Sequence, residues 1–487
     1  MAAVIACIFL VSCSLLNPEQ NSSDTSYLAN GPLAEAPGGP GQEANITEAK
    51  DESARQATEA AAQAEAMLAA ERERLAAMLL ILKDAPLRKY ENGDLRKFPY
   101  PYNAMAAITS DCDGSTPETF ERMHRFLNTF AETPYGAGLG LDIADSFFVY
   151  NASNYNSDSD LLIYCEGIDP HTPAKAAFIK KYYDCGWIDS MHSFGNFSRS
   201  DTALFTRELA IKAWDLLNEA GIQPTVWIDH GTETNVQNFG AYSPLSASSY
   251  QMGDNPKSPY YHTDITLANS VHYVWYSRHS DLFGYDFPLM PRILRDGSKV
   301  WGFHRYTNEF KKNGEIDWVW RPNRLGDQIT AARLDALEKK GQYAIIAQHL
   351  TISQQDIQPQ EADFAALRLL AERFHEQQSI LVARTSRLLP YAVAQKYLSY
   401  QMAEYDGITL IRIVSILDPV TGARIPDLSE LAGLTFYCDD PQQTVIFVGD
   451  TPLAPENIQQ NPKDASGRAS VSIPWFAQDT FDYTSLQ

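Results

Sequence analysis

The chain has 487 residues, of which 44% are hydrophobic and 11% aromatic, enough to fill the core of more than one domain. Its formal net charge of −22 opposes binding to nucleic acid, because an acidic surface repels phosphate groups instead of displacing their counterions. The negative charge does not oppose binding to neutral or cationic polymers.

The first sixteen residues form an apolar segment that is too short to span a bilayer as a helix. We therefore predict that residues 1–16 are a signal peptide. The sequence Leu10-Val11-Ser12-Cys13 resembles the lipobox of bacterial lipoproteins, in which the cysteine carries the lipid. The resemblance implies export, lipidation at Cys13 and anchoring in the bacterial cell envelope, at the outer membrane or in the periplasm. Simple secretion is the alternative.

Two segments of contrasting composition follow. Residues 17–45 are rich in Gly, Pro, Ser, Asn and Glu and offer too little apolar area to fold, so we expect a disordered tether. Residues 46–85 consist mainly of strong helix formers and end before Pro86, which predicts a helical stalk. Packing of this stalk on the next domain and a self-associating coiled coil are both open, and the sequence indicates no oligomeric state.

Short apolar runs alternate with helical patterns between residues 100 and 401, which is typical of β/α units. The predicted strands are residues 104–110, 138–149, 187–192, 224–229, 271–276, 299–304, 343–349 and 379–383. The predicted helices are residues 117–130, 201–220, 327–340, 362–377 and 386–403. We therefore predict an α/β fold for residues 86–403, a distorted (β/α) barrel of about seven to eight strands.

The last part of the chain, residues 404–487, differs in character. Short strand patterns alternate with Pro, Gly, Asp and Asn turn residues, and there is no long helical pattern. This segment predicts a small β-sandwich-like accessory domain.

Several predicted strands end in side chains capable of acid–base or metal chemistry. These residues are Asp111, Asp113, His192, Asp229, His230, His304 and His349. Barrel enzymes place their catalytic groups at the carboxyl ends of the strands, so we expect these side chains around one cavity.

Two motifs in this set resemble those of the polysaccharide deacetylases. Residues 109–113, Thr-Ser-Asp-Cys-Asp, are similar to an Asp-x-Asp variant of the family's first motif. Residues 192–196, His-Ser-Phe-Gly-Asn, are similar to its His-Ser/Thr-x-x-His motif, with Asn196 in the second histidine position. The resemblance covers residues 100–400. It implies that Asp111 is the general base and that Asp113, His192 and Asn196 bind a divalent metal, with Zn²⁺ as the expected ion.

Asn196 departs from the family's pattern. An amide oxygen binds zinc less strongly than an imidazole nitrogen, so His230 is an alternative ligand. Both assignments are open at this stage.

Other parts of the barrel resemble the family in less specific ways. Residues 344–349 are similar to its last motif, which implies that His349 is the general acid toward the leaving group. Three neighbours, Trp227, Asp229 and His230, occupy the kind of strand end that carries the family's Asp-x-x-Asp-Trp motif. Arg321 is the nearest match to the family's Arg-x-Pro-Tyr element. The resemblance therefore makes four residues candidate substrate contacts, namely Trp227, Asp229, His230 and Arg321.

Aromatic residues are dense between residues 239 and 320. Sugar rings stack their C–H faces on aromatic side chains, so this density favours a glycan cleft, although core packing accounts for some of these rings.

The resemblance implies a metal-dependent hydrolase that removes acetyl groups from an exported or cell-surface polysaccharide. A catalytically silent barrel that binds glycan in the cell envelope is one alternative, favoured by Asn196 and the missing arginine motif. A glycoside hydrolase is another, and it needs two carboxyl groups about 5 to 10 Å apart. Asp111 and Asp113 lie one residue apart on the same side of a strand, which favours metal chemistry.

Overall fold

The computed structural model describes residues 41–152, 162–169, 171, 174–197, 205–231, 233–276 and 280–486. The predicted signal peptide, Cys13 and the tether as far as residue 40 lie outside the described residues. In the described part of the chain, no helix combines the length and the apolar character that crossing a membrane requires.

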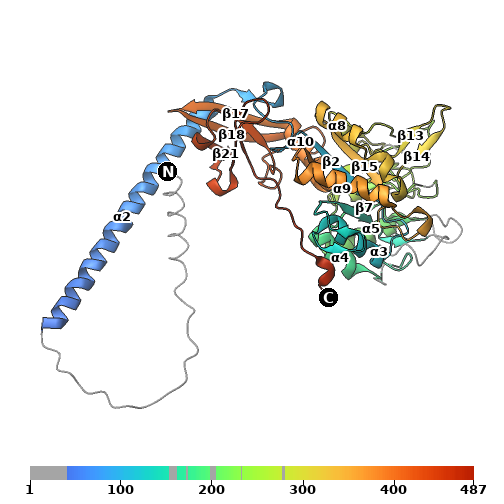
Figure 1. The fold of residues 1–487 in the computed structure, drawn as a ribbon, viewed down its shortest axis with the longest axis horizontal. Coiled ribbons are helices and arrows are strands. Elements are labelled where there is room, and N and C mark those ends of the chain that lie inside the picture. Colours follow the sequence, from blue (N-terminus) through green and yellow to red (C-terminus); the bar gives the residue numbers. More distant parts are fainter. Residues whose placement is uncertain are drawn as a thin grey trace, which may run out of the picture.

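A curled sheet of nine strands forms the centre of the larger part of the molecule (Figure 1). Its strands follow the order β11-β12-β10-β9-β7-β5-β2-β15, and β16 also pairs with β2. All neighbours in this sheet are parallel except β11 and β12. The strands are β2 (Ala104–Ser110), β5 (Ala144–Phe147), β7 (Ile188–His192), β9 (Val226–Ile228), β10 (Tyr273–Trp275), β11 (Leu289–Ile293), β12 (Lys299–Phe303), β15 (Tyr343–Gln348) and β16 (Ile380–Val382).

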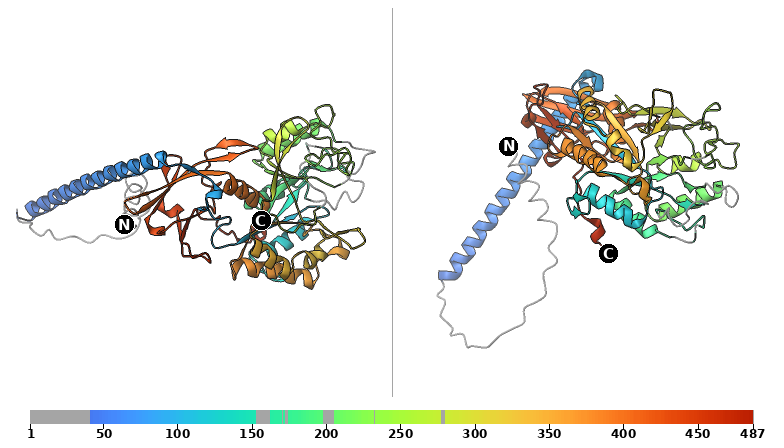
Figure 2. Two further views of the ribbon diagram at one scale, coloured as in Figure 1. Left: turned by 90° about the horizontal axis from the view of Figure 1, so that it is seen from above. Right: turned by 45° about the vertical axis from the view of Figure 1, so that its right-hand side comes forward.

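The two ends of this sheet approach each other. An isolated parallel bridge joins Tyr306, just after β12, to Ile346 in β15. Helices cover the outside of the sheet, and the chain therefore has a mixed α/β fold around a barrel-like sheet (Figure 2). The helices of this part are α3 (Pro117–Asn128), α4 (Ala176–Cys185), α5 (Arg207–Glu219), α6 (Thr263–Ala268), α7 (Leu325–Gln328), α8 (Ala331–Lys340), α9 (Glu361–His375) and α10 (Thr385–Tyr397).

The start of α3 is capped without help from the two aspartates that precede it. The Thr116 hydroxyl accepts a hydrogen bond from the backbone N–H of Thr119, and Pro117 is the first helical residue. Both features are typical of helix N-termini. Asp111 and Asp113 are therefore not needed to start the helix.

Shorter elements decorate this domain. Two antiparallel hairpins are β3 (Glu132–Thr133) with β4 (Gly136–Ala137), and β13 (Asn308–Phe310) with β14 (Ile316–Trp318). A short parallel pair is formed by β6 (Tyr150–Asn151) and β8 (Gly195–Asn196). The 3-10 helices of the whole chain are η1 (Tyr90–Asn92), η2 (Pro322–Arg324), η3 (Gln355–Ile357), η4 (Pro441–Gln443), η5 (Pro455–Asn457) and η6 (Tyr483–Ser485).

A second, smaller sheet forms after α10. Its strands are β1 (Leu87–Arg88), β17 (Leu398–Tyr405), β18 (Ile408–Asp418), β19 (Gly422–Arg424), β21 (Thr444–Val448) and β22 (Thr451–Pro452). A separate three-stranded sheet contains β20 (Thr435–Tyr437), β23 (Gln459–Asn461) and β24 (Ser470–Ser472). The prediction of a helix through residue 403 is wrong beyond Tyr397. Residues 398–405 pair with both β1 and β18, and this long-range pairing overrides the local helical pattern.

Helix α2 (Gly41–Asp84) projects from the smaller sheet, away from the barrel-like domain (Figure 1). Among the side chains of this helix that the structure describes, only those of its last turns are buried. Met78 and Leu82 are buried against Leu410 and Phe447, whereas Met67, further toward the N-terminus, is 50% exposed. The chain therefore enters the folded body through a helix that is anchored at one end.

The C-terminal segment returns from the smaller sheet to the barrel-like domain (Figure 1). Near its end, Asp482 accepts a hydrogen bond from Arg125 of α3 at 2.7 Å, and Lys181 of α4 donates to the carbonyl of Leu486 at 2.8 Å. The last residues thus tie the two parts of the molecule together.

Candidate metal centre

The loop after β2 carries Asp111 and Asp113, and it is fastened to the loop after β15. The backbone N–H of Asp111 donates to the carbonyl of Gln348 at 2.8 Å. The carbonyl of Gly114 accepts from both the N–H and the hydroxyl of Ser353, at 2.9 and 2.7 Å. These bonds hold the two aspartates beside His349, although more than two hundred residues separate them in the sequence.

His192 and His230 reach the same edge of the sheet from adjacent strands. His192 is the last residue of β7 and lies opposite Ile228 at the end of β9, and His230 follows two residues later. The ring of Phe148 packs against both imidazoles, with centroids 5.0 and 5.2 Å away. Parallel pairing therefore brings the two histidines together, and the phenylalanine supports them from one side.

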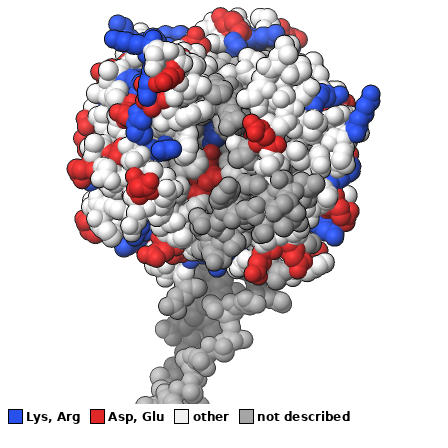
Figure 3. Space-filling view, turned by 90° about the vertical axis from the view of Figure 1, so that its right-hand side faces the viewer, with Lys and Arg blue, Asp and Glu red and all other residues white. Residues whose placement is uncertain are grey.

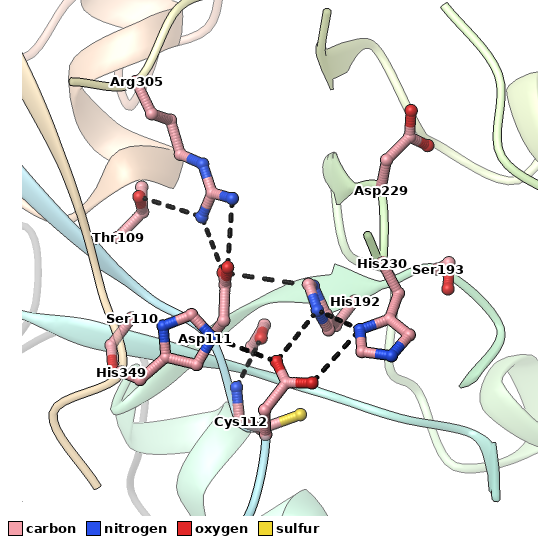
Figure 4. Close-up of polar contacts among 12 residues, drawn as sticks. Thr109, Ser110, Asp111, Cys112, His192, Ser193, Asp229, His230, Arg305 and His349 are labelled. Carbon is pink, nitrogen blue, oxygen red and sulfur yellow. Dashed lines mark hydrogen bonds and ion pairs between the residues drawn. The ribbon is translucent and has the colours of Figure 1, made fainter. Parts of the chain in front are cut away.

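One carboxylate oxygen of Asp113, one nitrogen of His192 and one nitrogen of His230 form a triangle whose corners all lie within 4.8 Å of one another (Figure 4). The distances below run from each nitrogen to its nearer carboxylate oxygen. His192 Nε2 lies 3.1 Å from Asp113 Oδ2, His230 Nδ1 lies 3.1 Å from Asp113 Oδ1, and the two nitrogens are 3.0 Å apart. Ligand atoms bonded at about 2.0 to 2.2 Å to one tetrahedral or octahedral ion lie about 3 to 3.5 Å from each other. The triangle thus has the dimensions of one face of a metal site.

Burial and charge put His230 and Asp113 in the protonation states that a metal requires. Burial lowers the pKa of His230 to about 4, so its imidazole is neutral at physiological pH. Burial alone would raise the pKa of Asp113, but the neighbouring His230 and His192 outweigh it and hold this pKa well below its usual range. Among the described residues, buried Asp113 Oδ2 has no partner with hydrogen-bond geometry. One carboxylate and two imidazoles suit Zn²⁺ and similar divalent ions.

Asp111 forms a buried ion pair instead of joining this triangle. Arg305 donates to both of its carboxylate oxygens, at 2.6 and 3.0 Å, and is itself 1% exposed (Figure 4). Burial alone would raise the pKa of Asp111, but the charges of Arg305, His192 and His349 lower it below its ordinary value. The carboxylate is therefore ionised and held in one orientation.

Arg305 also limits the number of metal ions that the site can bind. Asp111, Asp113 and His349 form a second group of donor atoms within 4.8 Å of one another. The guanidinium of Arg305 already neutralises Asp111, and its positive charge opposes a second cation beside it. The residues therefore fit one ion, not two.

His349 approaches the Oδ2 atom of Asp113, whereas His230 approaches Oδ1. The Nε2 atom of His349 is 3.3 Å from Asp113 Oδ2, and its ring packs on Trp320 with centroids 4.4 Å apart. Burial by itself would lower the pKa of His349, but its interaction with Asp113 and the charge of Asp111 raise it above the ordinary value. The side chain is thus biased toward its proton-donating form.

These residues line a cavity of 360 Å³, a size that accommodates a small ligand or one sugar unit of a longer chain. Figure 3 shows a hollow on this end of the molecule, with acidic atoms at its floor. The lining residues are Asp111, Asp113, His192, Asp229, His230, Gly231, Trp275, Arg305, Thr307, Trp318, Trp320, Ala347 and His349.

Asp229 lines the cavity, but its carboxylate points away from the triangle (Figure 4). It accepts hydrogen bonds from the indole of Trp227 at 2.8 Å and from Gln251 at 2.6 Å, and burial raises its pKa to about 8. Trp227 is completely buried and does not line the cavity. Its place in this site is therefore to hold Asp229.

The remaining sequence candidates lie apart from the cavity. Asn196 is in β8, and its carbonyl accepts a hydrogen bond from the N–H of Ala152. Arg321 packs over the ring of Trp320 at 5.4 Å, and His304 stacks on Tyr285. None of these three lines the cavity, and His230 occupies the position that the sequence alone offered to either Asn196 or His230.

Sequence reasoning missed Arg305, although a signal was present. Trp301 and Phe303 of β12 are fully buried and belong to the main core. Side chains alternate along a strand, so Arg305 faces the same side as these two residues. A buried arginine at a strand end that also carries carboxylates is a strong indication of an ion pair.

No family model, no curated protein and no solved structure matches this chain.

Proposed function

We propose that the protein is a metal-dependent hydrolase that removes acetyl groups from an exported or cell-surface polysaccharide. The observation that carries this proposal is the triangle of Asp113, His192 and His230, together with Asp111 and His349, whose donor atoms lie within 4.8 Å of each other and of Asp113. In this proposal the barrel-like domain is of the polysaccharide deacetylase type, and Cys13 anchors the exported protein.

A divalent ion such as Zn²⁺, held by Asp113, His192 and His230, would supply a more acidic water and a Lewis acid for the acyl oxygen. Asp111 then accepts a proton from the attacking water, because Arg305 keeps its carboxylate ionised and oriented. His349 gives its proton to the leaving nitrogen or oxygen as the acyl bond breaks. The products are acetate and a free amine or hydroxyl on the sugar.

The pKa shifts of the two acid–base residues support this division of roles. The pKa of Asp111 is lowered and that of His349 is raised, so at neutral pH the carboxylate is ready to accept a proton and the imidazole is biased to donate one. Pairs of titratable groups with opposed shifts in one cavity are typical of acid–base catalysis.

The same shifts argue against the two alternatives from the sequence. A glycoside hydrolase needs one protonated carboxyl group as its acid, whereas the pKa values of both Asp111 and Asp113 are lowered. Asp229 has a raised pKa, but its carboxyl group is turned away and bonded to Trp227 and Gln251. A silent glycan-binding barrel has no need for a buried base, an acid and a set of metal ligands in one cavity. A hydrolase gives each of these groups a role: Asp111 is the base, His349 is the acid, and the metal ligands are Asp113, His192 and His230.

The proposal is tested by acetate release from a panel of N- and O-acetylated oligosaccharides, with and without a chelator. We expect release by the wild-type protein, its loss after chelation and its recovery on adding Zn²⁺. Asp111→Asn should lower release without removing the metal. Asp317→Asn is a matched control, because Asp317 pairs with Arg324 away from the cavity. No release from any member of the panel by the zinc-loaded protein would contradict the proposal.

A further inference from the structure

Three of the eight tryptophans in the chain line the candidate cavity, and the hydrolysis proposed above uses none of them. Trp187, Trp214, Trp227 and Trp301 are buried in the core, and Trp475 packs against Tyr391. Trp275, Trp318 and Trp320, by contrast, are only partly buried and present surface to the cavity. Large apolar rings that remain accessible beside polar catalytic groups indicate a binding surface.

Two of these tryptophans belong to one short segment. Trp318 ends β14, and Trp320 follows it with Val319 between them. Val319 is fully buried, and its N–H donates to the carbonyl of Thr307. The hairpin β13–β14 thus turns its valine into the protein and both indoles toward the cavity.

This segment also lies beside the proposed acid. The ring of Trp320 packs on His349 with centroids 4.4 Å apart, and the amide of Gln348 donates to the carbonyl of Arg321. A flat ligand ring that rests on the indoles would therefore lie next to the group that protonates the leaving atom.

Trp275 forms another part of the wall. Its ring packs under the guanidinium of Arg305 at 4.0 Å. Within the described part of the chain, its buried indole N–H has no hydrogen-bond partner. Leaving such a donor unsatisfied costs free energy, and a hydroxyl or carbonyl oxygen of a ligand would satisfy it.

The charge of the cavity narrows the class of ligand. Among the described residues that line it, the one arginine, Arg305, is already paired with Asp111, and there is no lysine. An anionic polymer would find no unpaired lysine or arginine among these residues, whereas an uncharged glycan offers apolar C–H faces for the indoles and hydroxyls for Trp275.

We propose that Trp318, Trp320 and Trp275 form a stacking subsite for the sugar units next to the acetylated one, so that the substrate is an uncharged glycan chain and not a single sugar. This inference rests on the proposed function and adds its substrate class. It assigns Trp318 a role in binding and none in proton transfer.

The test compares the wild-type protein with Trp318→Ala and Trp318→Phe. Substrates are the pentamers and monomers of N-acetylglucosamine and of O-acetylated xylose, and the measured quantity is the ratio of kcat/KM for pentamer to that for monomer. We expect this ratio to fall between about twofold and tenfold in Trp318→Ala and to recover in Trp318→Phe. Phe310→Ala on the same hairpin is the matched control, because Phe310 is 55% exposed and does not line the cavity.

Binding separates this inference from the proposed hydrolysis. Titration of each zinc-loaded protein with the pentamers, followed by calorimetry, needs no turnover. Weaker pentamer binding by Trp318→Ala, with Phe310→Ala like the wild type, supports the subsite even if no acetate is released. An unchanged pentamer affinity in Trp318→Ala, or binding of neither pentamer by the wild type, would overturn it even if acetate is released from other substrates.

Discussion

The guanidinium of Arg305 donates to both carboxylate oxygens of Asp111 inside the cavity, at 2.6 and 3.0 Å. The two residues are 194 positions apart in the sequence, on the loop after β2 and on the segment after β12. Because both side chains are almost fully buried, each depends on the other for charge balance. The pair therefore links the stability of the barrel-like domain to the orientation of the proposed base.

Removal of this arginine should affect both properties. In Arg305→Met the buried Asp111 carboxylate loses its partner, and we expect the free energy of unfolding to fall by about 3 kcal/mol. Since the pKa of Asp111 then rises, kcat/KM at neutral pH should fall by about a hundredfold. Urea unfolding and acetate-release kinetics measure the two effects. Arg207→Met, which breaks an exposed pair with Asp264, should cost less than about 1 kcal/mol.

The pH dependence of activity follows from the two opposed pKa shifts. A base works when deprotonated, so the lowered pKa of Asp111 keeps it active down to acidic pH. An acid works when protonated, so activity falls as pH rises through the pKa of His349, which lies above its ordinary value of about 6.5. We expect His349→Gln to remove this alkaline limb and to lower kcat by about a hundredfold or more while the metal stays bound. An alkaline limb that persists unchanged in His349→Gln would refute the assignment.

A histidine outside the site, His262, should contribute to the loss of stability in mild acid. His262 is completely buried, its Nε2–H donates to the carbonyl of Gln237, and its Nδ1 accepts from the hydroxyl of Thr266. Burial lowers the pKa of His262 to about 4. Below pH 6.5, the ordinary pKa of histidine, this side chain is protonated in the unfolded chain but stays neutral in the folded protein. The free energy of unfolding therefore falls as pH decreases from about 6.5 to about 4 and then levels off.

The expected loss from His262 is at most about 3 kcal/mol over this range. Urea unfolding between pH 7.5 and pH 4 measures it. The variant His262→Gln should be less stable at neutral pH but should show a shallower decline toward acid. Equal slopes for the two proteins would show that His262 is not responsible.

The choice of the third metal ligand yields a paired prediction. His230 Nδ1 belongs to the donor triangle, whereas Asn196 lies in β8 and does not line the cavity. We expect the affinity for zinc to fall by about tenfold or more in His230→Ala and to be unchanged in Asn196→Ala. Zinc affinity measured by competition with a chromogenic chelator decides between them. Loss of zinc in Asn196→Ala alone would restore the assignment implied by the family motif.

The sequence predicted the parts of the site that local patterns control. The apolar run 104–110 became β2 with its predicted bounds, and His192 and His349 lie at the end of β7 and just after β15. These strands are buried on both faces, and an apolar run that stops at a polar residue marks their ends clearly. Of the seven polar residues predicted to lie around one cavity, six line it and His304 does not.

Long-range pairing explains what the sequence did not predict. The partner of Asp111 comes from the far side of the sheet, and no local spacing relates Arg305 to it. The strand predicted over residues 138–149 shortened to Ala144–Phe147, because only residues 144–147 pair with β2 and β7. Likewise, the predicted helix 386–403 ends at Tyr397, because residues 398–405 form a strand that pairs with β1 and β18. The ion-pair partner of Asp111 and the bounds of these strands therefore depend on residues that are distant in the sequence.

The proposed hydrolysis depends on one cation at the triangle of Asp113, His192 and His230. Anomalous diffraction from zinc-soaked crystals, recorded above and below the zinc absorption edge, locates the ion directly. We predict a single peak within about 2.0 to 2.2 Å of one oxygen of Asp113, His192 Nε2 and His230 Nδ1, and its absence in Asp113→Ala. A wild-type crystal soaked in excess zinc that shows no peak at these atoms would contradict the central claim.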